Sequence, residues 1–226
     1  MSTLPLDIAP ELASTHDVEL VLSVKIGAGH DRDVWRHPLD DTLCVKVAQP
    51  NHGRAQNDID LHYGAHLQRR NISSPHVPRV YGMVPTDRGP GLVVDLVRQP
   101  DGTTCPTLPQ ALRSGMVGEA QAEAMVHEAC EWLARNGVML ADPGIHNVMV
   151  RGSPATGRPC LVFVDGLGTR NLDLKYWARC AFEPLERMTA RQKAAVFRDK
   201  FLRLLRDRSS KLWVPKRPSG VAQQVV

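Results

Sequence analysis

The feature that most constrains the fold is a change in residue pattern at Gln99-Pro100-Asp101-Gly102. Before this point, short runs rich in valine and leucine alternate with turn residues, a pattern typical of β-strands, and only residues 54–70 have helical spacing. After it, residues 119–136 and 172–207 have the apolar spacing of long helices. Because proline and glycine punctuate the change, we expect a turn or hinge there.

These patterns predict the α+β class, and composition limits the alternatives. With 226 residues, 42% apolar and 23% charged, the chain is long and apolar enough to fold without disulfides, and the five cysteines contain no C-x-x-C pair. The apolar runs are too short to span a membrane, and no signal-peptide pattern is visible, so we expect a cytoplasmic protein. A net charge of +4 predicts no specific nucleic-acid binding. We divide the chain into a lead-in (1–20), a β-rich part (21–98) and a mostly helical part (99–226).

A glycine loop, Gly27-Ala28-Gly29, follows the first strand candidate. A dinucleotide-binding fold would continue from such a loop into a helix. Here Val34 and Trp35 follow, and then Pro38, so we expect strand, loop and strand instead. The sequence also contains no phosphate-binding loop of the G-x-x-x-x-G-K-[ST] type.

Lys46 lies among apolar residues in a predicted strand, where an ammonium group needs a partner. Asp60, on the buried face of the following helix, is the candidate. Such a pair could aim the lysine at phosphate oxygens. The alternative is a lysine whose charged end reaches solvent and an aspartate that is simply hydrated.

Two further acidic positions lie near strand candidates. Asp142 and Asn147 are five residues apart in a loop that leads into a strand, and Asp165 directly follows another strand. A hairpin of these strands would bring Asn147 and Asp165 together, and Mg²⁺ prefers such oxygen ligands together with substrate phosphates. Asp142 could accept a hydroxyl proton. The alternative is that both segments are only β-turns.

The order of these features is similar to that of the protein kinase-like fold, with its glycine loop, strand lysine, helix acid, catalytic loop and metal aspartate. More closely, the chain resembles the YrbL family, named for the PhoP regulatory network. The resemblance covers about residues 22–201. The stretches that carry it are Gly27–His30, Cys44–Val47, Ala65–Arg70, Pro78–Gly82, Gly91–Gly102 and Asp165–Gly168.

This resemblance implies a two-lobed fold that binds ATP and Mg²⁺. Lys46 would contact the phosphates with Asp60 steadying it, and Asp142 would be the catalytic base. Asn147 and Asp165 would bind the metal. The nucleotide-binding residues that the resemblance implies are Gly27, Ala28, Gly29, Lys46, Asp95 and Val97.

The sequence departs from the protein kinase pattern in several places. Arg32 replaces the third loop glycine, Leu140-Ala141 replaces the His-Arg pair before the catalytic aspartate, and Gly166-Leu167 replaces Phe-Gly after Asp165. Only 61 residues follow Asp165, too few for the usual substrate-docking helices. We therefore expect a phosphotransferase acting on a hydroxyl of a small molecule or sugar rather than a peptide, or a pseudokinase that binds nucleotide as a regulatory module.

Three other features have both a functional and a structural interpretation. Residues 191–217 carry ten lysines and arginines and could meet an anionic partner, although a core-facing helix with a solvated basic side is the alternative. His62 and His66 are spaced to share a metal, but without a visible third ligand we interpret them as surface histidines. Cys44 would share a strand face with Lys46, and we interpret it as a packed thiol.

Overall fold

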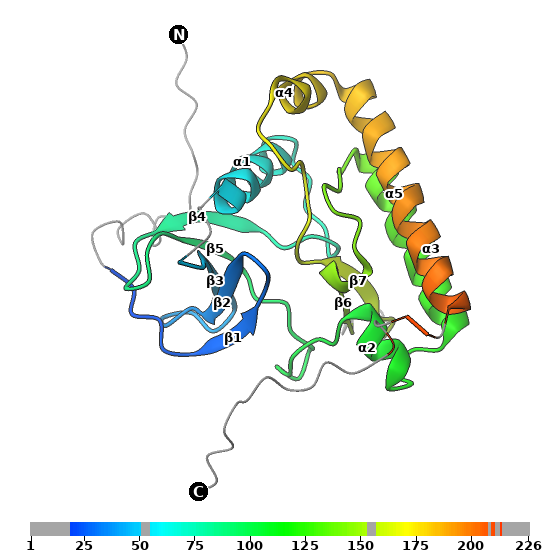
Figure 1. Ribbon diagram of the computed structural model, residues 1–226, viewed down its shortest axis with the longest axis horizontal. Coiled ribbons are helices and arrows are strands. Elements are labelled where there is room, and N and C mark those ends of the chain that lie inside the picture. The colour runs from blue at the N-terminus through cyan, green and yellow to red at the C-terminus, as the bar shows by residue number, and fades with distance from the viewer. Residues whose placement is uncertain (1–18, 51–54, 153–156, 208, 211–212, 214–226) are drawn as a thin grey trace, which may run out of the picture.

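The computed structural model describes residues 19–50, 55–152, 157–207, 209–210 and 213. The first part of the chain forms a five-stranded antiparallel sheet in the order β1-β2-β3-β5-β4 (Figure 1). Helices make up most of the other described elements, so the mixed α+β class is confirmed. The strands are β1 (Lys25–Ala28), β2 (Arg32–Arg36), β3 (Leu43–Ala48), β4 (Val80–Val84) and β5 (Gly91–Asp95).

β1 and β2 form a hairpin around the glycine loop, which confirms the predicted strand, loop and strand. The N–H of Gly29 donates to the carbonyl oxygen of Arg32 at 2.7 Å and closes the turn. β1 begins four residues later than the run Val21–Ile26 suggested, and Val21 and Val24 are exposed. Leu20, at the end of the predicted lead-in, is buried and pairs with Thr86.

One helix, α1 (Ala55–Arg69), packs against β3, β4 and β5, as Figure 1 shows. Its buried residues include Tyr63, Gly64 and Leu67, in the spacing that the sequence predicted. Gly64 is required for this close approach, since a Cβ there would lie 2.6 Å from the side chain of Val80.

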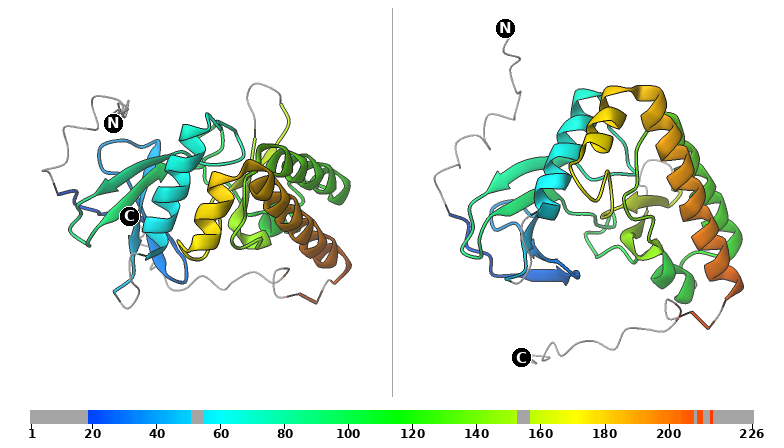
Figure 2. Two further views of the ribbon diagram at one scale, coloured as in Figure 1. Left: turned by 90° about the horizontal axis from the view of Figure 1, so that it is seen from above. Right: turned by 45° about the horizontal axis from the view of Figure 1, so that its top comes forward.

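The second part of the chain is built on two long antiparallel helices that lie side by side in both views of Figure 2. A β-hairpin, β6 paired with β7, packs against them, with the Phe163 and Phe197 rings 5.2 Å apart. The elements are α2 (Leu108–Arg113), α3 (Glu119–Asn136), the 3₁₀ turn η2 (Ile145–Asn147), β6 (Val148–Arg151), β7 (Cys160–Phe163), α4 (Leu174–Ala181) and α5 (Glu183–Arg206).

α5 is amphipathic along its length. Phe197, Phe201 and Leu204 are buried in the core with α3, whereas Arg191 and Arg198 are exposed. The core-facing alternative is thus confirmed for the described part of the basic segment. Residues 208, 211–212 and 214–217 of that segment lie outside the described residues. Among the helices that the structure describes, each is too short or too polar to cross a lipid bilayer.

The segment 99–102 forms the turn that its residues predicted. Gly102 adopts a positive φ of 82°, and its N–H donates to the carbonyl oxygen of Gln99 at 2.9 Å. The Gln99 side chain in turn donates to the Val150 carbonyl oxygen and accepts from the N–H of Gly152. The turn that joins the two parts of the chain is therefore held to the β6 strand of the second part.

Candidate functional site

A large cleft lies between the sheet and the helical part, with a volume of about 1010 Å³. Most of the residues singled out in the sequence line it, although they come from segments up to 138 positions apart, from Gly27 to Asp165. The predicted residues on the cleft wall are Gly27, Ala28, Gly29, Lys46, Asp142, Asn147 and Asp165.

Arg32, at the position of the missing third glycine, makes three side-chain hydrogen bonds in this site. Its guanidinium donates to Asp60 Oδ2 at 2.6 Å, to Asn57 Oδ1 at 3.0 Å and to Asp165 Oδ1 at 2.8 Å. Only 6% of its side chain is exposed. Burial lowers the pKa of Arg32, but Asp60 and Asp165 raise it by more, so the charge is held firmly in place.

Lys46 projects from β3 towards the same carboxylates. Its ammonium donates to the carbonyl oxygen of Val164 at 2.7 Å and lies 3.9 Å from Asp60 Oδ2. The predicted pairing of Lys46 with Asp60 is thus a longer contact than that of Arg32 with Asp60. Asn57 reinforces the arrangement, because its Nδ2 donates to the Lys46 carbonyl oxygen at 2.9 Å and ties α1 to β3.

Asp165 is placed to act as an ionised oxygen ligand. Burial raises the pKa of its carboxyl group, but the charges of Lys46 and Arg32 and the hydrogen bond from the Gly166 N–H lower it by more. The net effect is a pKa below the ordinary value. The side chain is nevertheless 46% exposed on the cleft, so a cation in the cleft can reach it.

The β6–β7 hairpin brings Asn147 next to Asp165, as the sequence predicted. Val148 pairs with Phe163, and the N–H of Val164 donates to the Asn147 carbonyl oxygen at 3.0 Å. Asn147 Nδ2 donates to Asp142 Oδ2 at 3.1 Å, which turns the amide oxygen away from that carboxylate. The Asn147 amide oxygen and the Asp165 carboxylate are hard donors on one cleft wall, a set that fits Mg²⁺.

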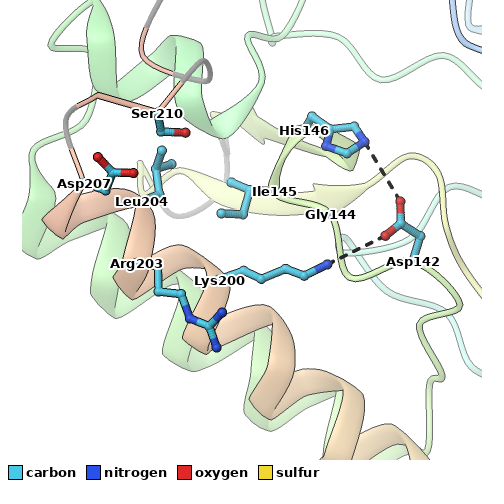
Figure 3. Close-up of a pocket in the computed structure, with 9 residues that line it drawn as sticks. All are labelled: Asp142, Gly144, Ile145, His146, Lys200, Arg203, Leu204, Asp207 and Ser210. Atoms are coloured by element: carbon cyan, nitrogen blue, oxygen red, sulfur yellow. Dashed lines mark ion pairs between the residues drawn. The ribbon is translucent and has the colours of Figure 1, made fainter.

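Asp142 lies where the large cleft meets a second, smaller cavity of about 300 Å³. Figure 3 shows Lys200, from α5, reaching towards Asp142 across this smaller cavity. The two side chains are 3.9 Å apart, and His146 Nε2 lies 4.0 Å from the other carboxylate oxygen. The cavity is lined by Asp142, Gly144, Ile145, His146, Lys200, Arg203, Leu204, Asp207 and Ser210.

Two of the predicted nucleotide-binding residues lie elsewhere. Asp95 and Val97 are not among the described residues that line the large cleft. The Asp95 carboxylate accepts from the Tyr81 hydroxyl at 2.9 Å and from the Arg79 N–H at 2.7 Å, and Val97 is buried in a small cluster with Cys105 and Val162. In this structure Asp95 therefore has a hydrogen-bonding role within the sheet, and Val97 is part of the core.

Sequence reasoning missed two cations on the cleft wall. Arg113 ends α2, and Arg170 follows the loop after Asp165. The α2 helix itself was not predicted, although Thr107 and Gln110 form a capping box that the T-x-x-Q spacing makes visible in the sequence. Recognising that box would have placed Arg113 in the last turn of a helix.

The fold and the cleft together define an α+β protein in which an antiparallel sheet and a helical part enclose a charged, partly basic site. The family described as "PhoP regulatory network protein YrbL" matches residues 18–200, and the chain belongs to this family. It is similar to the proteins named "Uncharacterized protein YrbL" of Escherichia coli (strain K12) and of Shigella flexneri. Each is 28% identical over 173 residues, which cover 74% of this chain and 81% of the relative.

Proposed function

We propose that the chain has a reduced kinase-like fold and transfers the γ-phosphoryl group of Mg-ATP to a hydroxyl of a small molecule or sugar. The observation that carries this proposal is the convergence of Lys46, Asn147 and Asp165 with Asp142 on one cleft beneath the glycine loop. These side chains come from both parts of the chain, and all of them line the same cleft.

The nucleotide end of the cleft suits a phosphate chain. Glycines at positions 27 and 29 leave room for phosphates close to the backbone, and Lys46 supplies a fixed positive charge below them. Arg113 and Arg170 add positive charge elsewhere in the lining of the cleft. Mg²⁺ bound by Asn147 and Asp165 would neutralise further phosphate charge. Phosphoryl transfer depends mainly on such positioning and neutralisation.

The acceptor end is the smaller cavity beside Asp142. A hydroxyl bound there would lie between the carboxylate of Asp142, which accepts its proton, and the metal end of the cleft. The hydrogen bond from Asn147 holds this carboxylate in place. A cavity of about 300 Å³ is the size of a compact metabolite. This supports a small-molecule acceptor over a protein.

A second candidate function is a nucleotide-binding pseudokinase with a regulatory role. The observation that favours it is the ion pair of Arg32 with Asp165, at 2.8 Å. This contact occupies one oxygen of the carboxylate that Mg²⁺ needs. A protein that keeps this pair when nucleotide binds would bind the ligand without effective transfer.

The test is ADP formation from Mg-ATP, with and without a panel of sugars, polyols and amino alcohols. We expect one acceptor to stimulate the parent, and Asp142→Asn to lower that rate by about 100-fold or more while keeping nucleotide affinity. Asp101→Asn, in an exposed turn away from the cleft, is the matched control. Binding without turnover for every acceptor would favour the pseudokinase, and equal rates in parent and Asp142→Asn would show that Asp142 is not the base.

A further inference from the structure

Three side chains that commonly ligate metals meet where α1, α4 and α5 come together. They are His66, Cys180 and Glu186, and one ligand atom from each lies within 4.8 Å of the others. His66 Nε2 is 2.7 Å from Glu186 Oε1. In the part of the chain that the structure describes, this is the one such group of three or more histidine, cysteine, aspartate or glutamate residues. It lies outside the cleft described above.

This cluster corrects the interpretation of His66 as a surface histidine. Its side chain is 7% exposed and that of Glu186 is 1% exposed, whereas Cys180 is half-buried. His62, one turn earlier, is exposed as expected and contacts Trp177. Cys180 and Glu186 could not be recognised from the sequence as partners of His66, because they follow it by more than one hundred residues.

A second set of groups surrounds these three. Arg70 Nη1 donates to Glu186 Oε2 at 2.7 Å, so the second carboxylate oxygen is fixed while the first faces His66. Tyr176, one helical turn before Cys180 on α4, is buried. The Tyr63 ring stacks on His66 with centroids 5.9 Å apart. Such outer partners orient ligands in metal sites and set their affinity.

We propose that His66, Cys180 and Glu186 bind a Zn²⁺ ion. Imidazole, thiolate and carboxylate together suit a borderline-soft cation, whereas Mg²⁺ and Ca²⁺ prefer oxygen ligands alone. Bonds of about 2.0–2.3 Å in a tetrahedron place the ligand atoms about 3.3–3.7 Å apart. From the present spacing, with every pair of ligand atoms within 4.8 Å, His66 and Glu186 have to separate slightly as the ion replaces the hydrogen bond between them, and the Cys180 sulfur has to lie within about 3.7 Å of both. Water completes the fourth position.

A role in holding the structure together fits better than a catalytic role. A cysteine, histidine and glutamate could also form a nucleophile, a base and an orienting group. However, neither of the two cavities described above is lined by His66, Cys180 or Glu186, so neither offers a substrate access to the thiol. The ion would instead fasten α1, which carries Asp60, to the start of α5, which carries Lys200.

The test uses the full chain without a histidine tag, first stripped with a chelator and then titrated with Zn²⁺ or Co²⁺. We expect one equivalent of Zn²⁺ to bind and raise the melting temperature. Co²⁺ should give a near-ultraviolet thiolate charge-transfer band and the visible bands of a tetrahedral ion. Cys180→Ser should lose the charge-transfer band and weaken Zn²⁺ binding by at least about 100-fold, since loss of an outer partner alone costs about 10–100-fold. Cys160→Ser, which removes a half-buried cysteine on β7, should behave as the parent.

Two results would overturn the proposal. One is the absence of stoichiometric Zn²⁺ binding, or the same cobalt spectrum in parent and Cys180→Ser. The other is fast alkylation of Cys180 by iodoacetamide that Zn²⁺ does not slow, which would identify a reactive thiol instead of a ligand. If Cys180→Ser does not fold, alkylation of the parent still decides, because bound Zn²⁺ should slow the reaction of iodoacetamide with Cys180 in particular, as mass spectrometry can show.

Discussion

Replacing Arg32 with alanine removes the group that joins the glycine hairpin to α1 and to the end of the β6–β7 hairpin. The guanidinium makes three charged or polar hydrogen bonds, to Asn57, Asp60 and Asp165, at 2.6–3.0 Å. The Asp60 side chain is only 11% exposed. Without Arg32, its remaining partners are the Gln56 amide at 2.9 Å and the Lys46 ammonium at 3.9 Å.

The loss of stability expected for Arg32→Ala follows from how deeply each partner of Arg32 is buried. Removing one member of a buried ion pair costs about 3–5 kcal/mol, because the other charge stays buried. Asp60 keeps two partners, and Asp165 is 46% exposed, so that solvent screens its share. We therefore expect Arg32→Ala to lower the free energy of unfolding by about 3 kcal/mol. For a chain of this size, this corresponds to a fall in melting temperature of about 6–12 °C.

Lys25→Ala is the matched control for this measurement. Lys25 pairs with Asp33 at 2.7 Å in the same sheet, but the two side chains are 43% and 20% exposed. An exposed pair of this kind contributes at most about 1 kcal/mol. Urea unfolding of both variants and the parent at one pH gives the comparison. If the losses of Arg32→Ala and Lys25→Ala agree within about 0.5 kcal/mol, the reasoning about the buried arginine is refuted.

Three further predictions concern other parts of the fold. Gly168→Ala should lose about 1–3 kcal/mol more stability than Gly102→Ala in urea unfolding, because both have a positive φ but only at position 168 would a Cβ meet the Tyr63 ring, 2.7 Å away. Equal losses would contradict this. Burial holds the pKa of His37 below its ordinary value of 6.5, so this group contributes stability that is lost as pH falls through 6.5 towards the folded pKa. The free energy of unfolding of His37→Gln should therefore fall less than that of the parent between pH 7 and pH 5. Parallel plots of this free energy against pH for the two proteins would argue against the prediction. Burial raises the pKa of Cys44 to about 11, so iodoacetamide at pH 8 should leave it unmodified in the folded protein and modify it in urea, as mass spectrometry can show.

The elements with strong local signals were predictable from the sequence. Helix α3 was expected at 119–136 and forms there, because its apolar spacing is regular and Gly137, with a φ of 71°, ends it. The β6–β7 hairpin followed from two short apolar runs, and with it the approach of Asn147 to Asp165. In these cases the residues that decide the structure are close in sequence.

Contacts between distant segments were not predictable in the same way. Arg32 and Asp165 are 133 residues apart, and no periodicity links them. The sequence showed only that the third loop glycine was missing, which gave no reason to place a buried guanidinium between two carboxylates. Likewise, helical spacing placed His66 on α1, but only the packing of α4 and α5 brings Cys180 and Glu186 beside it.

The central claim is that the cleft binds a magnesium nucleotide through Lys46 and Asp165. Its most direct test is the melting temperature of the parent, Asp165→Asn and the control Asp101→Asn, each with ATP in excess Mg²⁺ or in EDTA. At a ligand concentration of 100 Kd, binding adds about 2.7 kcal/mol. We predict a rise of about 5–10 °C in the parent and the control that requires Mg²⁺ and is absent in Asp165→Asn. No rise in any protein, or the same rise in Asp165→Asn as in the parent, would contradict the claim.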